Sequence, residues 1–189
     1  MRSAAARMQL LIEDLLAYSR INANDRKFER TDLNAIVEEV VNDMKEAIEE
    51  KNATVEVTDL CHAKIIPFQF RQLMHNFISN SLKFANPQVP LHILITSEIA
   101  KGKTWYNERL LPEKEYCHIA VKDNGIGFSP EYNERIFEVF QKLHTKEEYA
   151  GTGIGLAIVK KIIENHNGII TATGKPNKGA TFDIYIPAD

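Results

Sequence analysis

The sequence predicts a mixed α/β fold, in which amphipathic helices pack against short β-strands. Three observations support this class. Apolar residues recur at the three- and four-residue spacing of helices in several stretches, short segments alternate apolar and polar residues as strands do, and glycine-bearing turns separate them. The chain has 189 residues, 44% hydrophobic and 26% charged, which suffices for one substantial core with or without a helical appendage.

Composition also excludes several classes of protein. The formal net charge is −3 and no run of Lys or Arg exceeds two residues, so nucleic-acid binding has no support. No apolar run approaches the roughly 20 residues of a membrane span, and the N-terminus lacks a signal-peptide core. Cys61 and Cys117 are far apart in the sequence, so we expect reduced cysteines in a cytoplasmic protein, with a structural disulfide as the alternative.

An amphipathic helix is predicted from Ser3 to about Ile21, and nothing nearby covers its apolar face. That face consists of Met8, Leu11, Ile12, Leu15, Leu16 and Tyr18. An uncovered stripe of this kind favours a partner helix, whereas packing back on the rest of the chain is the alternative. The polar segment Asn22–Arg30 is predicted to be a linker, which divides the chain into units 1–27 and 28–189.

A second helix is predicted after Thr31 and Asp32, either of which is a plausible N-cap. Its apolar residues from Leu33 to Ile48 repeat at three and four, which is typical of a helix that covers a sheet. Strands are expected at 54–58, 61–66, 91–99 and 116–122, the last two joined by a long polar hairpin.

The helix predicted from Pro67 to Phe84 has two distinct faces. Its core face carries Phe70, Leu73, Met74, Phe77, Ser81 and Phe84. A polar stripe about a quarter turn away carries Gln72, Asn76, Asn80 and Lys83. Amide oxygens and an ammonium one turn apart favour a bound metal ion and phosphate, although an ordinary amphipathic helix with scattered asparagines is the alternative.

The first glycine-bearing turn, DNGIGFSP, follows a predicted strand. Asp123 stands where the strand ends, and Gly125 and Gly127 let the backbone turn under a ligand without a Cβ. Ser129 and Pro130 then cap a predicted helix, EYNERIFEVF, whose inward residues are Ile136, Phe137 and Phe140.

The second glycine-bearing segment follows a polar stretch, 141–150, that we expect to be a mobile loop. Gly151, Gly153 and Gly155 lead into a helix that ends at Asn167-Gly168, so its N-terminal N–H groups can receive an anion. Strands at 169–173 and 181–186, joined by the turn PNKG, complete the chain. Neither glycine run matches a P-loop or a Rossmann fingerprint, so both of those nucleotide folds are excluded.

Four motifs in order resemble those of the ATP-binding catalytic domain of sensor histidine kinases, in the GHKL superfamily with the Bergerat fold. They are the N box HNFISNSLKF, the glycine box DNGIGF, the phenylalanine box IFEVFQKLH and the second glycine box GTGIGLAIVKKIIENHNG. MQLLIEDLLAYSRIN resembles the end of the second helix of the dimerisation domain. The resemblance implies a two-layer α/β sandwich, with a mixed sheet covered on one face by three helices and an additional N-terminal helix.

The resemblance also implies a nucleotide site for ATP and Mg²⁺. Asn80 would hold the metal with Asn76 beside it, and Lys83 would face phosphate. Asp123 would accept from the adenine amino group, supported by Thr181, although a turn cap is the alternative for Asp123. Gly125 and Gly127 would shape the adenine pocket. The second glycine box would contribute Gly151, Thr152, Gly153, Ile154, Gly155 and Leu156, and Phe84 would line the site, with a plain core role open for Phe84 and Leu156.

The phosphoacceptor of the resembled kinases is a histidine in a pattern like HE-L-R-x-P. No histidine here has such surroundings, neither His62, His75, His92, His118, His144 nor His166. We therefore expect a fragment of a longer sensor. Whether sequence outside this chain anchors the full-length protein to a membrane is left open. The implied partners are the dimerisation domain of the same kinase, a response regulator of a two-component phosphorelay and a second copy of the kinase.

Three functions remain open at this point. The first is a histidine kinase catalytic domain that donates the γ-phosphoryl group of ATP to a histidine. The second is a GHKL ATPase, which would need a glutamate base one turn before the metal-binding asparagine, where this chain has Asn76. The third is a module that binds nucleotide without catalysis.

Overall fold

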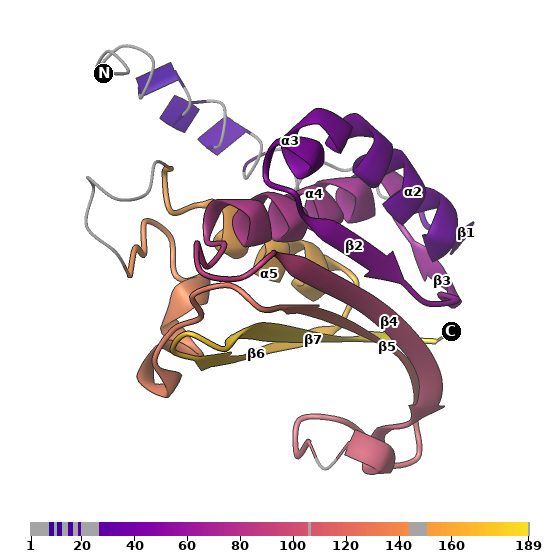
Figure 1. The fold of residues 1–189 in the computed structure, drawn as a ribbon. Coiled ribbons are helices and arrows are strands. Elements are labelled where there is room, and N and C mark those ends of the chain that lie inside the picture. Colours follow the sequence, from indigo (N-terminus) through magenta and orange to yellow (C-terminus); the bar gives the residue numbers. More distant parts are fainter. Residues whose placement is uncertain are drawn as a thin grey trace.

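The central feature of the fold is a mixed sheet of five strands in the order β2-β4-β5-β7-β6 (Figure 1). A computed structural model describes residues 8–9, 11–12, 15–16, 19, 27–105, 107–143 and 151–188. The strands are β2 (Thr54–Val57), β4 (His92–Lys101), β5 (Glu115–Asp123), β6 (Ile169–Lys175) and β7 (Gly179–Pro187). β2 runs parallel to β4, and every other neighbouring pair is antiparallel.

Helices cover one face of this sheet (Figure 1). They are α2 (Leu33–Asp43), α4 (Pro67–Lys83) and α5 (Gly155–Asn165), with the short α3 (Lys45–Glu50) after α2. The core lies between the two layers and includes Val37, Leu73, Phe77, Ile95, Ile119, Ile158, Ile162 and Ile184. The predicted two-layer sandwich of a mixed sheet and three covering helices is therefore confirmed.

Helix α4 has the two faces that the sequence predicts. Phe70, Leu73, Met74, Phe77 and Ser81 are buried. Pro67 occupies the first helical turn, where its missing N–H costs no hydrogen bond. Phe84, expected on the core face, is the C-cap residue and is only half-buried.

A small two-stranded sheet differs from the predicted linker. β1 (Glu29–Asp32) pairs antiparallel with β3 (His62–Ile65), so residues 29 and 30, predicted as linker, belong to a strand. The partner strand lies some thirty residues further along, and short-range pattern does not reveal such pairing. Asp32 is the N-cap of α2, as predicted, and accepts a hydrogen bond of 2.9 Å from the backbone N–H of Asn34.

The predicted helix over 131–140 is wrong. Two 3₁₀ turns stand there, η2 (Pro130–Tyr132) and η3 (Arg135–Phe137). Ile136 and Phe137 are buried as expected, but Phe140 is 55% exposed. Its φ is +65°, and its backbone N–H donates to the carbonyl oxygen of Gly153 at 3.0 Å. This long-range hydrogen bond holds the backbone outside the helical region, so the Phe140 side chain points to solvent.

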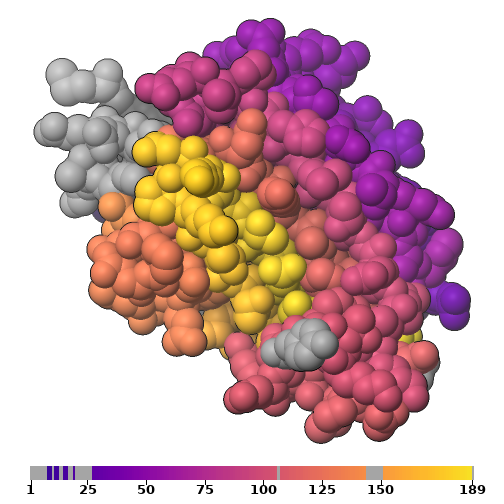
Figure 2. All heavy atoms as spheres, turned by 60° about the horizontal axis from the view of Figure 1, so that its bottom comes forward, coloured from indigo at the N-terminus to yellow at the C-terminus, as the bar shows by residue number. Residues whose placement is uncertain are grey.

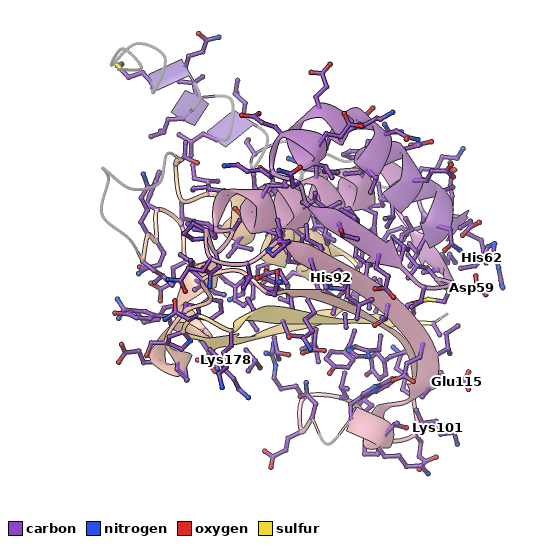
Figure 3. All side chains as sticks on the ribbon, in the orientation of Figure 1. Asp59, His62, His92, Lys101, Glu115 and Lys178 are labelled. Atoms are coloured by element: carbon purple, nitrogen blue, oxygen red, sulfur yellow. A yellow bond between two sulfur atoms is a disulfide. The ribbon has the colours of Figure 1, made fainter. Side chains whose placement is uncertain are left out.

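The prediction of reduced cysteines is also wrong for this structure. Cys61, just before β3, and Cys117 in β5 form a disulfide with their Cα atoms 7.0 Å apart. The bond lies near the end of β3 that carries His62 (Figure 3). The two cysteines are 56 residues apart in the sequence, so the sequence alone does not show that they are close in space.

The long hairpin between β4 and β5 folds against the sheet face away from the helices. It begins with the 3₁₀ turn η1 (Gly102–Trp105), and Lys101 and Glu115 pair across its base (Figure 3). Figure 2 shows this hairpin (rose) beside the C-terminal strands (yellow). Leu110, Tyr116 and Tyr185 form a second small core there, with Trp105 packed against it.

The predicted N-terminal helix lies mostly outside the described residues. The described positions 8–9, 11–12, 15–16 and 19 are helical. Their apolar side chains are exposed, namely Met8, Leu11, Ile12, Leu15 and Leu16. In the described part of the chain, no helix combines the length and apolar character that crossing a membrane requires.

Candidate functional site

A cavity of about 470 Å³ opens where the C-terminal half of α4 faces the start of α5. Eleven of the site residues predicted from the sequence line it: Asn76, Asn80, Lys83, Phe84, Asp123, Gly127, Gly151, Thr152, Gly153, Gly155 and Leu156. The fold thus brings together segments that are up to 80 residues apart in the sequence. Phe84 and Leu156 are half-buried and line the cavity, and Leu156 also packs against the hydrophobic core.

The polar stripe of α4 forms one wall of the cavity. The side-chain amide of Asn76 donates to the backbone oxygen of Gln72 at 2.9 Å, which directs its own oxygen away from that bond. The side chain of Asn80 makes no hydrogen bond within the described residues, and it lines the cavity one turn later. Its amide oxygen is therefore available to a ligand.

Two lysines converge at Gly151. The Lys142 ammonium donates to the carbonyl oxygen of Gly151. A Cβ on Gly151 would lie 2.6 Å from the Lys83 nitrogen, so the Lys83 side chain fills that space. Burial, and then the charge of Lys142, lower the pKa of Lys83. Two cations in one concave site favour an anionic ligand, whose charge would offset their repulsion.

Asp123 is 9% exposed and ends β5 at the cavity. One carboxylate oxygen accepts from the backbone N–H groups of Gly125 at 2.9 Å and Ala180 at 3.3 Å. The other accepts from the Ser81 hydroxyl at 3.2 Å. Burial raises the pKa of Asp123, although these hydrogen bonds oppose the shift. The second oxygen retains acceptor capacity for a ligand's N–H group.

The entry to α5 lies directly against α4. A Cβ on Gly155 would lie 2.8 Å from the Asn76 side-chain oxygen, so a larger residue there would require the Asn76 side chain to move. Gly153 has φ +79°, a conformation that favours glycine. The first N–H groups of a helix have no partner within it and can receive an anion. Gly155 and Leu156, at the start of α5, line the same cavity as the two lysines.

Three predicted site residues do not line the cavity. Gly125 lies behind it, where a Cβ would come within 2.5 Å of the Phe84 carbonyl oxygen, so this glycine permits packing of the turn against the end of α4. Ile154 is fully buried in the core. Thr181 lies within β7, opposite Lys122 and Thr173, and the adjacent Ala180 supplies the hydrogen bond to Asp123.

Several lining residues escaped the sequence analysis and gave no local signal: Ser79, Phe128, Lys142, Leu143, Ile158, Ala180 and Phe182. Ser81 is not among the described lining residues, but it donates a hydrogen bond to Asp123. Its hydroxyl on an otherwise apolar helix face is a usable signal for a buried polar partner. His75 lines the cavity, whereas His166 is buried elsewhere.

The expected mobile loop is described only in part. Gln141, Lys142 and Leu143 line the cavity. Residues 144–150 lie outside the described residues, so the prediction of mobility over 141–150 stays a prediction.

The donor set fits magnesium better than a metal that prefers nitrogen or sulfur. Within the described ranges, no group of three or more His, Cys, Asp or Glu side chains could hold a metal ion. Mg²⁺ prefers oxygen, keeps several waters and uses one or two protein ligands together with phosphates. The free amide oxygen of Asn80 beside a cationic cluster meets that requirement.

Comparison with known proteins agrees with this geometry. Residues 66–189 match the family model of the histidine kinase-, DNA gyrase B- and HSP90-like ATPases. The chain is 38% identical over 180 residues to the phytochrome-like protein Cph1 of Synechocystis, covering 95% of this chain and 22% of that protein. It is 39% identical over 181 residues to cyanobacterial phytochrome A of Nostoc, covering 95% and 22%. The chain thus spans about a fifth of the length of these relatives.

Solved structures share the fold. The catalytic domain of histidine kinase ThkA, in a nucleotide-free form, has a TM-score of 0.66 at 26% identity, covering 85% of this chain and 95% of that chain. Full-length ShkA in complex with AMPPNP has a TM-score of 0.74 at 24% identity, covering 97% and 36%.

Proposed function

We propose, from the premise that this chain belongs to the family of histidine kinase-, DNA gyrase B- and HSP90-like ATPases, that it is the ATP-binding catalytic domain of a sensor histidine kinase. In this proposal it donates the γ-phosphoryl group of ATP to a histidine on a dimerisation domain. The similarity to phytochromes and other sensor kinases supports it.

One observation carries the proposal. A single cavity holds an acceptor-only carboxylate, Asp123, and two converging ammonium groups, Lys83 and Lys142. An adenine presents an N–H donor, and a triphosphate presents negative charge at the other end of the same molecule. ATP therefore complements both ends of the cavity, with Asp123 accepting from the adenine amino group and the lysines facing the phosphates.

Magnesium fits this arrangement through Asn80. The bound ion would neutralise phosphate charge, and Asn80 would supply a protein oxygen to it. Asn76 lies directly beside the entry of α5, since a Cβ on Gly155 would come within 2.8 Å of the Asn76 side-chain oxygen. Phosphoryl transfer asks the protein mainly for such positioning and charge neutralisation.

The cavity supports transfer to an external acceptor over hydrolysis. Asp123 is the only carboxylate among the described residues that line the cavity, and three donors already hold it. Asn76 occupies the place one turn before Asn80, and an amide cannot take a proton from water. A kinase whose nucleophile comes from another domain needs no such base in this cavity.

The proposed partners follow from the same reading. The exposed apolar residues of the N-terminal segment, Met8, Leu11, Ile12, Leu15 and Leu16, suit a helix of a dimerisation domain, which supports units at 1–27 and 28–189. A response regulator would receive the phosphoryl group from the histidine. The proposed location is cytoplasmic, because a kinase needs ATP and its response regulator there. The disulfide between Cys61 and Cys117 is the observation that opposes this location, since disulfides are rare in the cytosol.

The test uses this chain, γ-labelled ATP, Mg²⁺ and a separately made dimerisation domain that carries the acceptor histidine. Acid-labile label on that domain is the expected result. A matched dimerisation domain with the acceptor histidine changed to glutamine should remain unlabelled. Release of free phosphate without transfer would favour the ATPase reading, and nucleotide binding without either product would favour a non-catalytic module.

A further inference from the structure

A buried histidine lies at the end of the molecule away from the cavity, where α5 ends and α4 begins. His166 is the C-cap residue of α5 and is 3% exposed. The backbone N–H of Ile66, the N-cap residue of α4, donates to its Nε2 at 2.9 Å, so this nitrogen must accept. The proton therefore belongs on Nδ1, which donates to the carbonyl oxygen of Ile162 at 2.7 Å.

This contact and the nucleotide cavity lie at opposite ends of the same helix pair. α4 passes from Ile66 to Asn76 while α5 passes from Gly155 to His166, and at 1.5 Å per residue both segments are about 15 to 17 Å long. At the cavity end, Gly155 contacts Asn76 so closely that a Cβ would come within 2.8 Å. The two helices therefore run antiparallel, with a hydrogen bond between His166 and Ile66 at one end and a close approach of Gly155 to Asn76 at the other.

The ring of His166 also contacts the segment that precedes β1. The Phe28 ring meets it edge-on with a centroid distance of 5.2 Å, and the Phe70 ring from the first turn of α4 meets it at 5.1 Å. Phe28 is half-buried and lies immediately before β1, on the chain segment that leads from the N-terminal helix. Three parts of the molecule thus meet at one imidazole.

We propose that His166 is a positioning residue that fixes the axial register of α5 against α4, and that Phe28 links this register to the segment before β1. The consequence for the cavity rests on the proposed function. A shift of α5 along α4 would move Gly155 relative to Asn76, and with it the helix entry that faces the phosphates. If the segment before β1 moved so that Phe28 left the His166 ring, the contact between His166 and Ile66 would loosen. Nucleotide affinity would then change, although this contact lies at the opposite end of the two helices from the cavity.

Two substitutions of His166 separate positioning from packing. His166→Phe keeps a ring for Phe28 and Phe70 but leaves the Ile66 N–H without its acceptor. His166→Gln keeps a carbonyl oxygen that can accept from Ile66. The first readout is made without nucleotide: NMR shifts of the Gly155 backbone amide and the Asn76 side-chain amide should move in His166→Phe and return in His166→Gln.

The second readout is ADP affinity with Mg²⁺ by calorimetry, at a temperature where circular dichroism shows each variant folded. His166→Phe should bind about tenfold more weakly, and His166→Gln within about twofold of the original chain. Nitrogen-15 NMR of the imidazole should show the proton on Nδ1. Unmoved amides together with unchanged affinity in folded His166→Phe would overturn the proposal.

The proposed role of Phe28 is tested with a matched control variant on α4. Phe28→Ala should move the same two amides, whereas Phe68→Ala, which removes a phenylalanine that is 54% exposed in the first turn of α4, should not. Equal responses to both changes would overturn the role of Phe28. If the original chain bound no nucleotide, the proposed function would fail, while the amide shifts would still decide the role of His166.

Discussion

At the scale of single residues, the charge of Asp123 has two opposite effects, one on stability and one on ligand binding. Its carboxylate is buried among backbone donors at the end of a central strand, and burial raises its pKa. An acid whose pKa is raised by folding destabilises the folded protein wherever it is charged, and this cost disappears below the ordinary pKa of aspartate, near 4. The charge therefore lowers the stability of the empty domain at neutral pH while providing the acceptor for a ligand.

Asp123→Asn should consequently raise the melting temperature of the empty domain at neutral pH and weaken nucleotide binding. The amide oxygen can accept from Gly125 and Ala180 and the amide NH₂ can donate to Ser81, so the fold is retained. Losing a hydrogen bond to a charged acceptor should cost about 10- to 100-fold in ADP affinity by calorimetry. The gain in melting temperature should shrink as the pH falls toward about 4, and a gain that persisted there would contradict the assignment.

Asn80→Ala should weaken only the magnesium-dependent part of nucleotide binding. The Asn80 side chain lies on the polar stripe and outside the core, so the fold should remain intact. Calorimetry with ADP, with and without Mg²⁺, measures the difference. Asn76→Ala is the matched comparison on the same stripe, and equal affinities of Asn80→Ala and the original chain in both conditions would exclude the metal role.

At the residue scale, the sequence indicated which side chains lie together where one helix carried the whole pattern. Asn76, Asn80 and Lys83 repeat at helical spacing, so their common face was readable before any tertiary contact was known. Ala180 and Lys142 were not readable, because strand pairing and loop position bring them to the cavity from distant segments. Backbone donors such as the Ala180 N–H also have no side-chain signature in a sequence.

At the scale of elements, local pattern located α2, α4, α5 and the strands, but not the pieces that depend on distant partners. β1 exists because residues 29–32 pair with β3. The segment 130–140 has helical composition, yet it contains two 3₁₀ turns, and the backbone N–H of Phe140 donates to the distant Gly153 and not to a residue of a continuing helix. Tertiary contacts therefore decided the elements that sequence propensity missed.

The disulfide between Cys61 and Cys117 gives an element-scale prediction. It closes a loop across a separation of 56 residues, and the chain-entropy relation gives roughly 4 kcal/mol of stabilisation for a loop of that size. Reduction with dithiothreitol should lower the free energy of unfolding by about that amount, measured by urea denaturation. The double variant Cys61→Ala, Cys117→Ala should be insensitive to the reductant, and an unchanged urea midpoint on reduction of the original chain would contradict the bond.

At the scale of the whole molecule, the order of strands is what the sequence could not supply. β5 stands at the centre of the sheet because it pairs with β4 on one side and with β7 on the other, although β6 lies between β5 and β7 in the chain. Alternation within a strand reveals its faces but not its neighbours. The sandwich itself was predicted through the order of four motifs, whose spacing is a property of the whole chain.

This chain alone should bind ATP without labelling itself and without appreciable hydrolysis. None of its histidines has the surroundings of the acceptor, and an acceptor that is not held in line with the γ-phosphate forgoes a large proximity advantage. A general base normally contributes about two to four orders of magnitude, and Asn76 supplies none.

Incubation with γ-labelled ATP, followed by measurement of acid-labile protein label and of released phosphate, checks both parts. Strong protein label would reveal an unrecognised acceptor. Rapid phosphate release that Asn76→Ala abolishes would favour the ATPase reading.

The hydrogen bond from the Phe140 N–H to the Gly153 oxygen has a consequence for how this protein can evolve. It holds the two ends of the intervening segment together at a fixed place beside the cavity. The described residues just inside these ends line the cavity, namely Gln141, Lys142, Leu143, Gly151 and Thr152. Natural variation at these positions can therefore change the cavity lining, and so the choice of partner or inhibitor, while the backbone hydrogen bond, which needs no particular side chain, is kept.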